Sequence, residues 1–260
     1  MNARVSLLDG FRVSVDDARA ETTVGGLPHG VQRLIAHLGL SGRPARGAVA
    51  GQLWPEVPES HAHGSLRSAL WRVQKAVPGL VDVSGGAVAL ARGVRVDVRE
   101  LVDWARAVLD PGTRVERIAT PAAALAGELL PGWYDDWVLL ERERLRQLRM
   151  HALEVLADRL VLAGRYGEAV QAAYEAARDE PLRESAHRAI VRVHLAEGNL
   201  AEAMRAYTTF RDALARELGV PPTRQMEDLV SRWQVRVVVG GPGVPGPRPG
   251  ARTTAGAPGA

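Results

Sequence analysis

The chain of 260 residues contains no cysteine. This absence excludes disulfide bonds, thiolate metal sites and a cysteine nucleophile. The chain also lacks any run near the roughly 18 uninterrupted apolar residues that indicate a membrane-spanning helix. Residues 1–16 include Arg4, Asp9, Arg12 and Asp16, where a signal peptide would have an apolar stretch. We therefore expect a cytoplasmic protein with no membrane partner.

Lysine is almost absent. Of the 33 basic residues, 32 are arginine and one is Lys75, and they are set against 30 acidic residues. The net charge is therefore only +3, so the sequence pI of about 9.8 reflects the use of arginine and gives weak support for nucleic-acid binding. The surplus of positive charge is local, because five basic and two acidic residues lie between Arg43 and Lys75.

Sequence patterns of enzymes are missing too. No glycine-rich loop ends in Gly-Lys-Ser or Gly-Lys-Thr, and no serine lies in a nucleophile-elbow pattern. His61 and His63 are two residues apart, so a helix would point them away from each other, whereas zinc needs three or four converging ligands. The adjacent Asp135 and Asp136 fit a helix N-terminus, where the dipole favours negative charge. We expect no catalytic activity, no metal site and no cofactor.

The residues that are present predict a folded core and two domains, because 46% of the 260 residues are hydrophobic. Apolar and polar residues alternate around Asp9-Gly10 and again around Ser84-Gly85-Gly86, which is typical of strand hairpins. Between these hairpins, apolar residues recur at helical spacing. The predicted elements are a hairpin over residues 4–15, helices over 28–39, over 46–54 and from 65 onward, and a hairpin over 80–90. This order is that of a winged helix with an additional N-terminal sheet.

The helix that begins at Ser65 has one apolar face and one basic face. The apolar stripe consists of Leu66, Ala69, Leu70, Val73 and Val77. The opposite face carries Arg67, Ser68, Trp71, Arg72 and Lys75. Arginine and serine bond to phosphate oxygens and base edges, and the arginine fork matches the paired acceptors of guanine in the major groove. The same face also fits the solvated side of an ordinary amphipathic helix.

Residues after position 96 predict a helical domain. Asp97-Val98-Arg99-Glu100 has capping-box spacing, which predicts a helix that ends at Asp110-Pro111-Gly112, a candidate domain boundary. A long amphipathic helix is predicted over residues 141–162. Residues 34 apart also match, and 34 is the tetratricopeptide (TPR) period. The matching pairs are Ala152 and Ala186, Gly164 and Gly198, Glu168 and Glu202, Ala169 and Ala203, and Ala172 and Ala206. An ordinary array of alanine-rich helical hairpins is the alternative.

The order of these segments closely resembles the antibiotic regulatory protein (SARP) family of bacterial transcriptional activators. In the N-terminal part the resemblance rests on LPHGVQRLIAHL, LWP, SLRSALWRVQKAV and the Gly-Gly wing. In the C-terminal part, residues 130–188 resemble the family's bacterial transcriptional activation domain (BTAD), with LPGWYDDWVLLERERLRQLRMHALEVLADRL followed by GRYGEAVQAAYEAARDEPLRESAHR.

The resemblance implies a mainly α fold in three parts. Residues 1–96 are expected to form an OmpR-type winged helix of the α+β class, the DNA-binding output module of two-component-like phosphorelays. Residues 97–239 are expected to form an all-α, TPR-like BTAD. Residues 240–260 are rich in glycine and proline, with Val244 as the one large apolar side chain, so we predict a disordered tail.

The resemblance also implies a function and a site. Family members are similar in activating secondary-metabolite (antibiotic) gene clusters, where they bind promoter direct repeats and recruit RNA polymerase. It therefore implies double-stranded promoter DNA and RNA polymerase holoenzyme as partners, with a homodimer on the DNA. The residues it places at the DNA are Arg67, Ser68, Trp71, Arg72 and Lys75 on the recognition helix, Arg43 and Arg46 as phosphate contacts beside the second helix, and Gly85 and Gly86 at the wing tip.

Two departures from the family pattern leave an alternative open. The wing has the sequence GGAVAL, without the tyrosine and the basic residue that are usual there. Trp71 stands where the family usually has a small or polar residue, and it could contact a thymine methyl group or cover a protein interface. The alternative is a TPR-like protein-interaction adaptor with a degenerate winged helix.

Overall fold

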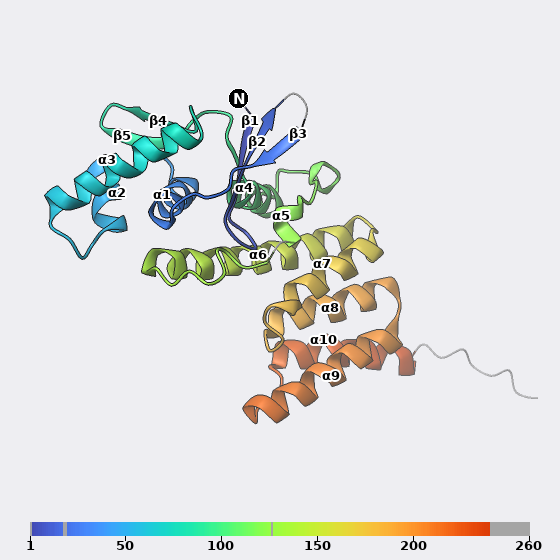
Figure 1. The fold of residues 1–260 in the computed structure, drawn as a ribbon. Coiled ribbons are helices and arrows are strands. Elements are labelled where there is room, and N and C mark those ends of the chain that lie inside the picture. The colour runs from blue at the N-terminus through green and yellow to red at the C-terminus, as the bar shows by residue number, and fades with distance from the viewer. Residues whose placement is uncertain (1, 18–19, 126, 240–260) are drawn as a thin grey trace, which may run out of the picture.

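The structure is a computed structural model that describes residues 2–17, 20–125 and 127–239. A small sheet and several helices gather at one end, helices stack at the other, and the long helix α6 (Asp136–Leu162) lies between the two groups (Figure 1). The predicted mainly α fold is confirmed. Within the described ranges, no helix has the length and apolar character needed to cross a membrane. The predicted disordered tail, residues 240–260, lies outside the described residues.

Four short strands form the N-terminal sheet in the order β3-β2-β1-β6. They are β1 (Asn2–Ser6), β2 (Arg12–Asp17), β3 (Ala20–Thr23) and β6 (Arg95–Val96). β1 pairs antiparallel with β2, as the predicted hairpin requires, and parallel with β6. The sequence did not predict β3 or β6, because β3 has no apolar alternation and β6 is defined only by its pairing with Arg4 and Val5.

Three helices and a hairpin complete the predicted winged helix. α1 (His29–Leu40) and α2 (Arg46–Leu53) lie close to their predicted ranges. The strands β4 (Val81–Ser84) and β5 (Ala87–Leu90) form the wing. At its tip, Gly85 and Gly86 have φ angles of 60° and 76°, the left-handed conformation that a type I′ turn requires at both positions.

Helix α3 (Glu59–Ala76) begins six residues before its predicted start at Ser65. Pro58 precedes the helix and is tolerated there, and Glu59 lies where the helix dipole favours an acid. Ala62 is 2% exposed, so packing against the core holds the additional turns. The predicted start was therefore wrong, and His61 and His63 lie inside the helix.

Helix α4 (Asp97–Leu109) begins where the sequence predicts, but the predicted capping box is wrong. Asp97 is the first helical residue, and its carboxylate accepts hydrogen bonds from the backbone N–H groups of Leu7 and Leu8 at 2.9–3.0 Å and from that of Val98 at 2.7 Å. Glu100 instead forms an ion pair with Arg95 at 2.7 Å. Burial raises the pKa of Asp97, while the three backbone donors act in the opposite direction.

The helical domain is a stack of antiparallel helices that repeats as predicted. After a 3-10 turn (Val115–Arg117) and α5 (Ala122–Leu125), the helices are α6, α7 (Tyr166–Arg178), α8 (Glu184–Glu197), α9 (Leu200–Leu218) and α10 (Arg224–Val239). Gly164 and Gly198, one repeat apart, end α6 and α8 with φ angles of 71° and 85°. Ala169 and Ala203 are at most 1% exposed, because a small side chain lets paired helices approach closely.

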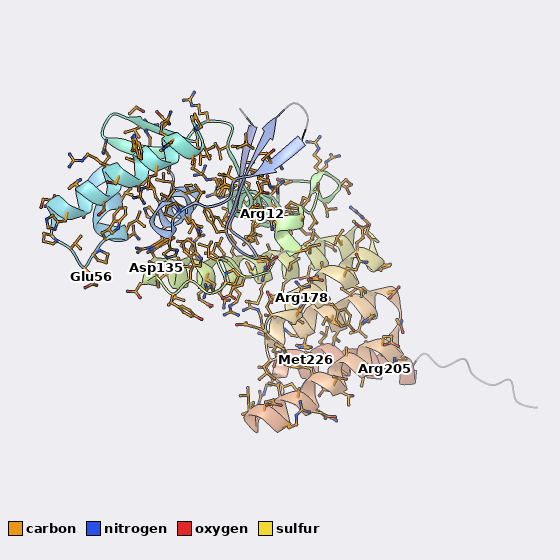
Figure 2. All side chains as sticks on the ribbon, viewed as in Figure 1. Arg12, Glu56, Asp135, Arg178, Arg205 and Met226 are labelled. Atoms are coloured by element: carbon orange, nitrogen blue, oxygen red, sulfur yellow. The ribbon has the colours of Figure 1, made fainter. Side chains whose placement is uncertain are left out.

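One hydrophobic core, shared by the two domains, extends from the N-terminal sheet to α8, and a second, smaller cluster packs α8 against α9 and α10. The turn between β1 and β2 lies against the segment before α6, where Leu130 N–H donates to the carbonyl of Leu7 at 2.8 Å and Asp9 N–H to that of Glu128 at 2.9 Å. Side chains also fill the space between α1 and the start of α6, around Asp135 (Figure 2). Asp135 pairs there with Arg33 of α1 at 2.5 Å. The winged helix is therefore packed against the helical domain and is not tethered by a linker alone.

Arginines bond to backbone carbonyls where elements meet. Arg99 on α4 donates to the carbonyls of Leu38, Gly39 and Ser41 at the C-terminus of α1, at 2.7–3.0 Å. Arg159 on α6 likewise reaches the C-terminus of α4, with 2.6 Å to the carbonyl of Val108. The last carbonyls of a helix lack intrahelical partners, and the planar guanidinium reaches several of them at once. Part of the arginine excess is therefore structural.

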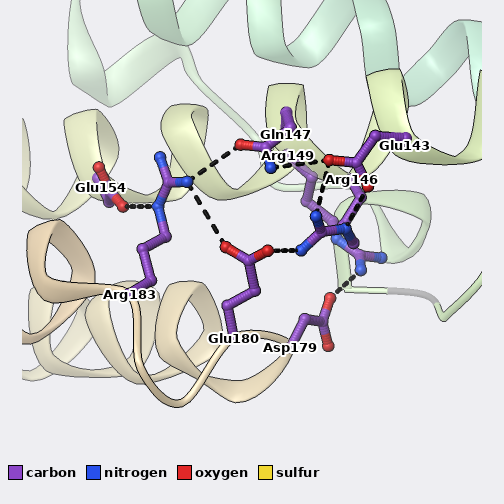
Figure 3. A network of polar contacts seen from close by, with 8 residues as sticks. All are labelled: Glu143, Arg146, Gln147, Arg149, Glu154, Asp179, Glu180 and Arg183. Atoms are coloured by element: carbon purple, nitrogen blue, oxygen red, sulfur yellow. Dashed lines mark hydrogen bonds and ion pairs between the residues drawn. The ribbon is translucent and has the colours of Figure 1, made fainter. Parts of the chain in front are cut away.

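Further arginines join α6 to the turn between α7 and α8 (Figure 3). Arg146 pairs with Glu143 and Glu180, and Arg149 pairs with Asp179. Arg183 donates to Glu154 at 2.7 Å. Apart from the pair between Arg146 and Glu143 within α6, these ion pairs connect residues about one repeat apart, so they fix the turn against α6.

Asp97→Ala should lower the free energy of unfolding by about 2–4 kcal/mol, because the N–H groups of Leu7 and Leu8 would be left buried without an acceptor. Asp97→Asn keeps one oxygen and should cost less. Urea denaturation of both variants measures this, with Asp103→Ala on the exposed face of α4 as the control. A loss for Asp97→Ala no greater than for Asp103→Ala would contradict it.

Acidification should destabilise the protein in part through His37. This side chain is buried in edge contact with Trp137, with ring centroids 5.5 Å apart, and burial lowers its pKa. The unfolded chain therefore binds this proton at a higher pH than the folded chain does, so stability falls as the pH drops below about 6.5. His37→Phe should reduce the difference in unfolding free energy between about pH 7.5 and about pH 5.5. An unchanged difference would show that His37 does not contribute.

Candidate nucleic-acid interface

The exposed face of α3 presents all five side chains that the sequence placed on it. Leu66, Ala69 and Val73 are at most 5% exposed and hold the opposite face in the core. The helix therefore has the orientation that its apolar stripe predicts. The exposed side chains are Arg67, Ser68, Trp71, Arg72 and Lys75.

Positive charge on this face is not neutralised. No acidic residue lies between Ser60 and Lys75. Among the ion pairs of the described residues, none involves Arg67, Arg72 or Lys75, whereas most arginines of the helical domain are paired. The face is therefore a local cationic surface on a chain of nearly balanced charge.

Trp71 lies in the middle of this face and is 63% exposed. The Nζ of Lys75 is 5.3 Å from the centroid of the indole ring, a cation–π contact that limits the motion of both side chains. The ring borders a shallow hollow between α3 and the wing. The other residues of this hollow are Arg46, Arg67, Leu70, Gln74, Val81 and Val83.

A second hollow lies on the other side of Arg67, between α3 and the start of α1. It is formed by Ser60, His61, Ser65, Ser68 and Arg72 of α3 together with Pro28 and Gly30. The sequence analysis did not assign His61 or Ser65 to the site. Their helical spacing to Ser68 and Arg72, in steps of four, three and four residues, is the signal that could have identified them.

The wing is anchored close to its tip by the segment before α2, and the tip carries no side chains. Arg46 N–H donates to the carbonyl of Gly86, and Val88 N–H to that of Pro44, both at 3.0 Å. Gly85 and Gly86 are exposed, and neither strand of the wing contains a basic residue. The tip therefore offers only backbone groups to a partner, and of these the carbonyl of Gly86 already accepts from Arg46.

Arg43 and Arg46 have different environments. Arg43 lies 3.3 Å from the carboxylate of Asp82 and donates to the carbonyl of Ser84 at 3.2 Å, so its guanidinium is engaged with β4. Arg46 is partly exposed beside Trp71 and Arg67. Of the two predicted phosphate contacts, only Arg46 shares a surface with the exposed face of α3.

The arrangement shows no assembled metal site within the described ranges, where no three His, Asp or Glu side chains converge. His61 and His63 both lie on α3, and His63 is 3.5 Å from Glu59. Asp135 is occupied by Arg33. The chemistry this surface offers is recognition of negative charge and of base edges.

Residues 96–232 match the family model of the Bacterial transcriptional activator domain. Over 224 residues, the chain is 31% identical to Regulatory protein AfsR of Streptomyces coelicolor. The aligned region makes up 82% of this chain and 22% of the relative. Regulatory protein AfsR of Streptomyces griseus is 31% identical over 205 residues, or 73% of this chain and 21% of the relative. The chain thus spans about a fifth of the length of these relatives.

The fold is similar to that of EmbR of Mycobacterium tuberculosis, solved in complex with a low-affinity phosphopeptide, with a TM-score of 0.67. The similarity covers 90% of this chain and 65% of that chain at 18% identity, so it shows the fold alone. The domain match extends over more than half of the chain, and the AfsR relatives are regulatory proteins. The chain therefore belongs to the bacterial transcriptional activator domain family.

Proposed function

We propose that this regulator is a sequence-specific DNA-binding activator of transcription, with α3 in the major groove. The observation that carries the proposal is the cationic face of α3, where Arg67, Arg72 and Lys75 lack carboxylate partners among the described residues. DNA phosphates supply the missing negative charge, and the guanidinium forks of Arg67 and Arg72 match the acceptors of guanine. Ser68 adds a hydroxyl between them.

The length of this face limits how much sequence one copy reads. Arg67 and Lys75 are eight residues apart, or about 12 Å along the helix. Base pairs stack at about 3.4 Å, so one helix reaches roughly four of them. Such a short site is not distinctive within a genome. We therefore propose that two copies pair on direct repeats in a promoter.

The wing has a supporting role in this proposal. Its tip carries no cation, so base recognition rests with α3, and Gly85 and Gly86 approach the backbone or minor groove through main-chain groups. Arg43 holds β4 in place and Arg46 faces the DNA beside Trp71. Phosphate contacts of this kind position a protein without selecting sequence.

The helical domain is proposed to contact RNA polymerase holoenzyme. Stacked repeat helices present an extended surface to partners, and the shared core holds this surface in a fixed position relative to α3. Because the sequence resembles the SARP regulators, we propose that the chain acts on a secondary-metabolite gene cluster. We propose the cytoplasm as its location. We assign no enzymatic role to the chain.

Arg67→Ala or Arg72→Ala should weaken binding to the preferred promoter by about 1–3 kcal/mol, because each removes a fork that reads a base. The site is first identified by sequencing DNA that copurifies with the protein. Fluorescence anisotropy in excess random DNA then gives the affinities. Arg205→Ala is the matched control, because Arg205 is an exposed arginine on α9, outside the winged helix.

Equal binding to any duplex would refute sequence-specific recognition. A stable protein partner recovered by pull-down, together with no preferred DNA site, would support the interaction adaptor instead. The 63% exposure of Trp71 is the observation that favours this second candidate.

Arg43→Ala should loosen the wing without altering α3. The exposed bonds to Asp82 and Ser84 contribute about 0.5–1 kcal/mol, so amide hydrogen exchange in β4 and β5 should be about two- to fivefold faster. DNA affinity should fall equally for all sequences. Arg92→Ala, on an exposed residue just after β5, is the control. Unchanged exchange in the wing would contradict this role of Arg43.

A further inference from the structure

A cavity of about 360 Å³ lies where the two domains meet. Its walls come from the turn after β1, from α4, from the segment before α6, and from α6 itself. It is separate from the DNA-facing side of α3, since none of its lining residues belongs to α3 or the wing. Its volume lies within the range of about 300–1,000 Å³ that small-molecule sites occupy.

Most of the cavity wall is apolar. The leucines that form it are Leu8, Leu101, Leu129, Leu139 and Leu145. Four of them are at most 8% exposed, but Leu139 is 41% exposed and stands at the open side. Water gains few hydrogen bonds against such a wall. An apolar group that enters would remove leucine surface from water, which is favourable.

The polar side of the cavity contains an arginine fork. Arg146 donates through Nε and Nη2 to the two oxygens of Glu143, at 2.9 and 2.7 Å, while its Nη1 bonds to Glu180 (Figure 3). Arg149, 7% exposed, forms the wall beside it and donates to the carbonyl of Gly127 at 3.1 Å. Arg146 belongs to the cavity lining, and its fork has the bidentate geometry that arginine uses for carboxylates.

Glu143 holds this fork from the solvent side. Its side chain is 56% exposed, and one of its oxygens also accepts a hydrogen bond from Nε2 of Gln147 at 2.9 Å, so its carboxylate meets water when it leaves the fork. The lining contains three arginines, Arg142, Arg146 and Arg149, and three acids, Glu128, Glu143 and Asp179. Glu180, outside this lining, also pairs with Arg146, so a ligand carboxylate that takes the place of Glu143 leaves the charge of this cluster unchanged.

We propose that this cavity binds a small amphipathic monoanion, whose apolar body lies on the leucines and whose carboxylate replaces that of Glu143 on Arg146. Such a ligand contacts Leu8 of the winged helix and α6 of the helical domain at the same time. It therefore stabilises the contact between the domains. This site does not depend on the proposed DNA binding, so either proposal can fail without the other.

The test uses the full chain and the fluorescent probe 1-anilinonaphthalene-8-sulfonate, a monoanion with an apolar body, with decanoate as a competing carboxylate. The probe should bind saturably at one site, and decanoate should displace it. Leu139→Trp fills the open side and should weaken binding about tenfold or more. Leu140→Trp, at the adjacent 74% exposed position outside the lining, is the matched control and should bind as the unmodified chain does.

Two further variants test the fork. Glu143→Gln removes the competing carboxylate and should tighten probe and decanoate binding several-fold, whereas Arg146→Gln should weaken both. Glu143 is exposed, so its variant is expected to remain folded, and circular dichroism checks this for each protein. Equal binding by the Leu139→Trp and Leu140→Trp proteins, or no gain in affinity with Glu143→Gln, would overturn the proposal.

Discussion

The relative position of the two domains depends on the buried carboxylate of Asp97. It holds the N–H groups of Leu7 and Leu8 at the end of β1, while the carbonyl of Leu7 accepts from Leu130 before α6. One short turn is thus bonded to α4 on one side and to the helical domain on the other. A buried N–H group without an acceptor costs free energy, so these bonds hold the turn in one conformation. The shared core then extends from the sheet into the helical repeats.

This constraint connects the candidate DNA surface with the cavity. α3 packs against α1, α1 packs against the start of α6, and the cavity lies between the same turn and α6. The cationic face is therefore presented from a body that includes both domains. A molecule in the cavity would act on the contact that orients that face, without touching it.

Arginine has two opposite uses in this protein. Arg99 and Arg159 end helices by donating to backbone carbonyls of neighbouring elements, and neither is available to a partner. Arg67 and Arg72 are exposed and have no carboxylate partner among the described residues. These four arginines contribute equally to the pI, so the high pI alone does not indicate a nucleic-acid partner. The distinction follows from what each guanidinium meets in the fold.

Local patterns predicted much of the fold. The wing follows from Gly85 and Gly86, and the helical repeats from matched positions such as Gly164 and Gly198. Predictions failed where a distant partner decides the structure. The pairing of β6 needs β1, and the start of α3 depends on the burial of Ala62. The phosphate contact of Arg43 stays a prediction, and the fold adds an ion pair with Asp82 that its place beside the second helix did not indicate.

The sequence by itself determined which segments are helices, where glycine permits a turn, and which face of α3 is exposed, because these depend on residues within a few positions of each other. Only the tertiary structure decided that Asp97 accepts hydrogen bonds from the turn after β1 as well as from the first turn of its own helix. It also decided which arginines remain unpaired, and it created the cavity beside Arg146. These features depend on groups far apart in the chain, whose proximity is set by packing.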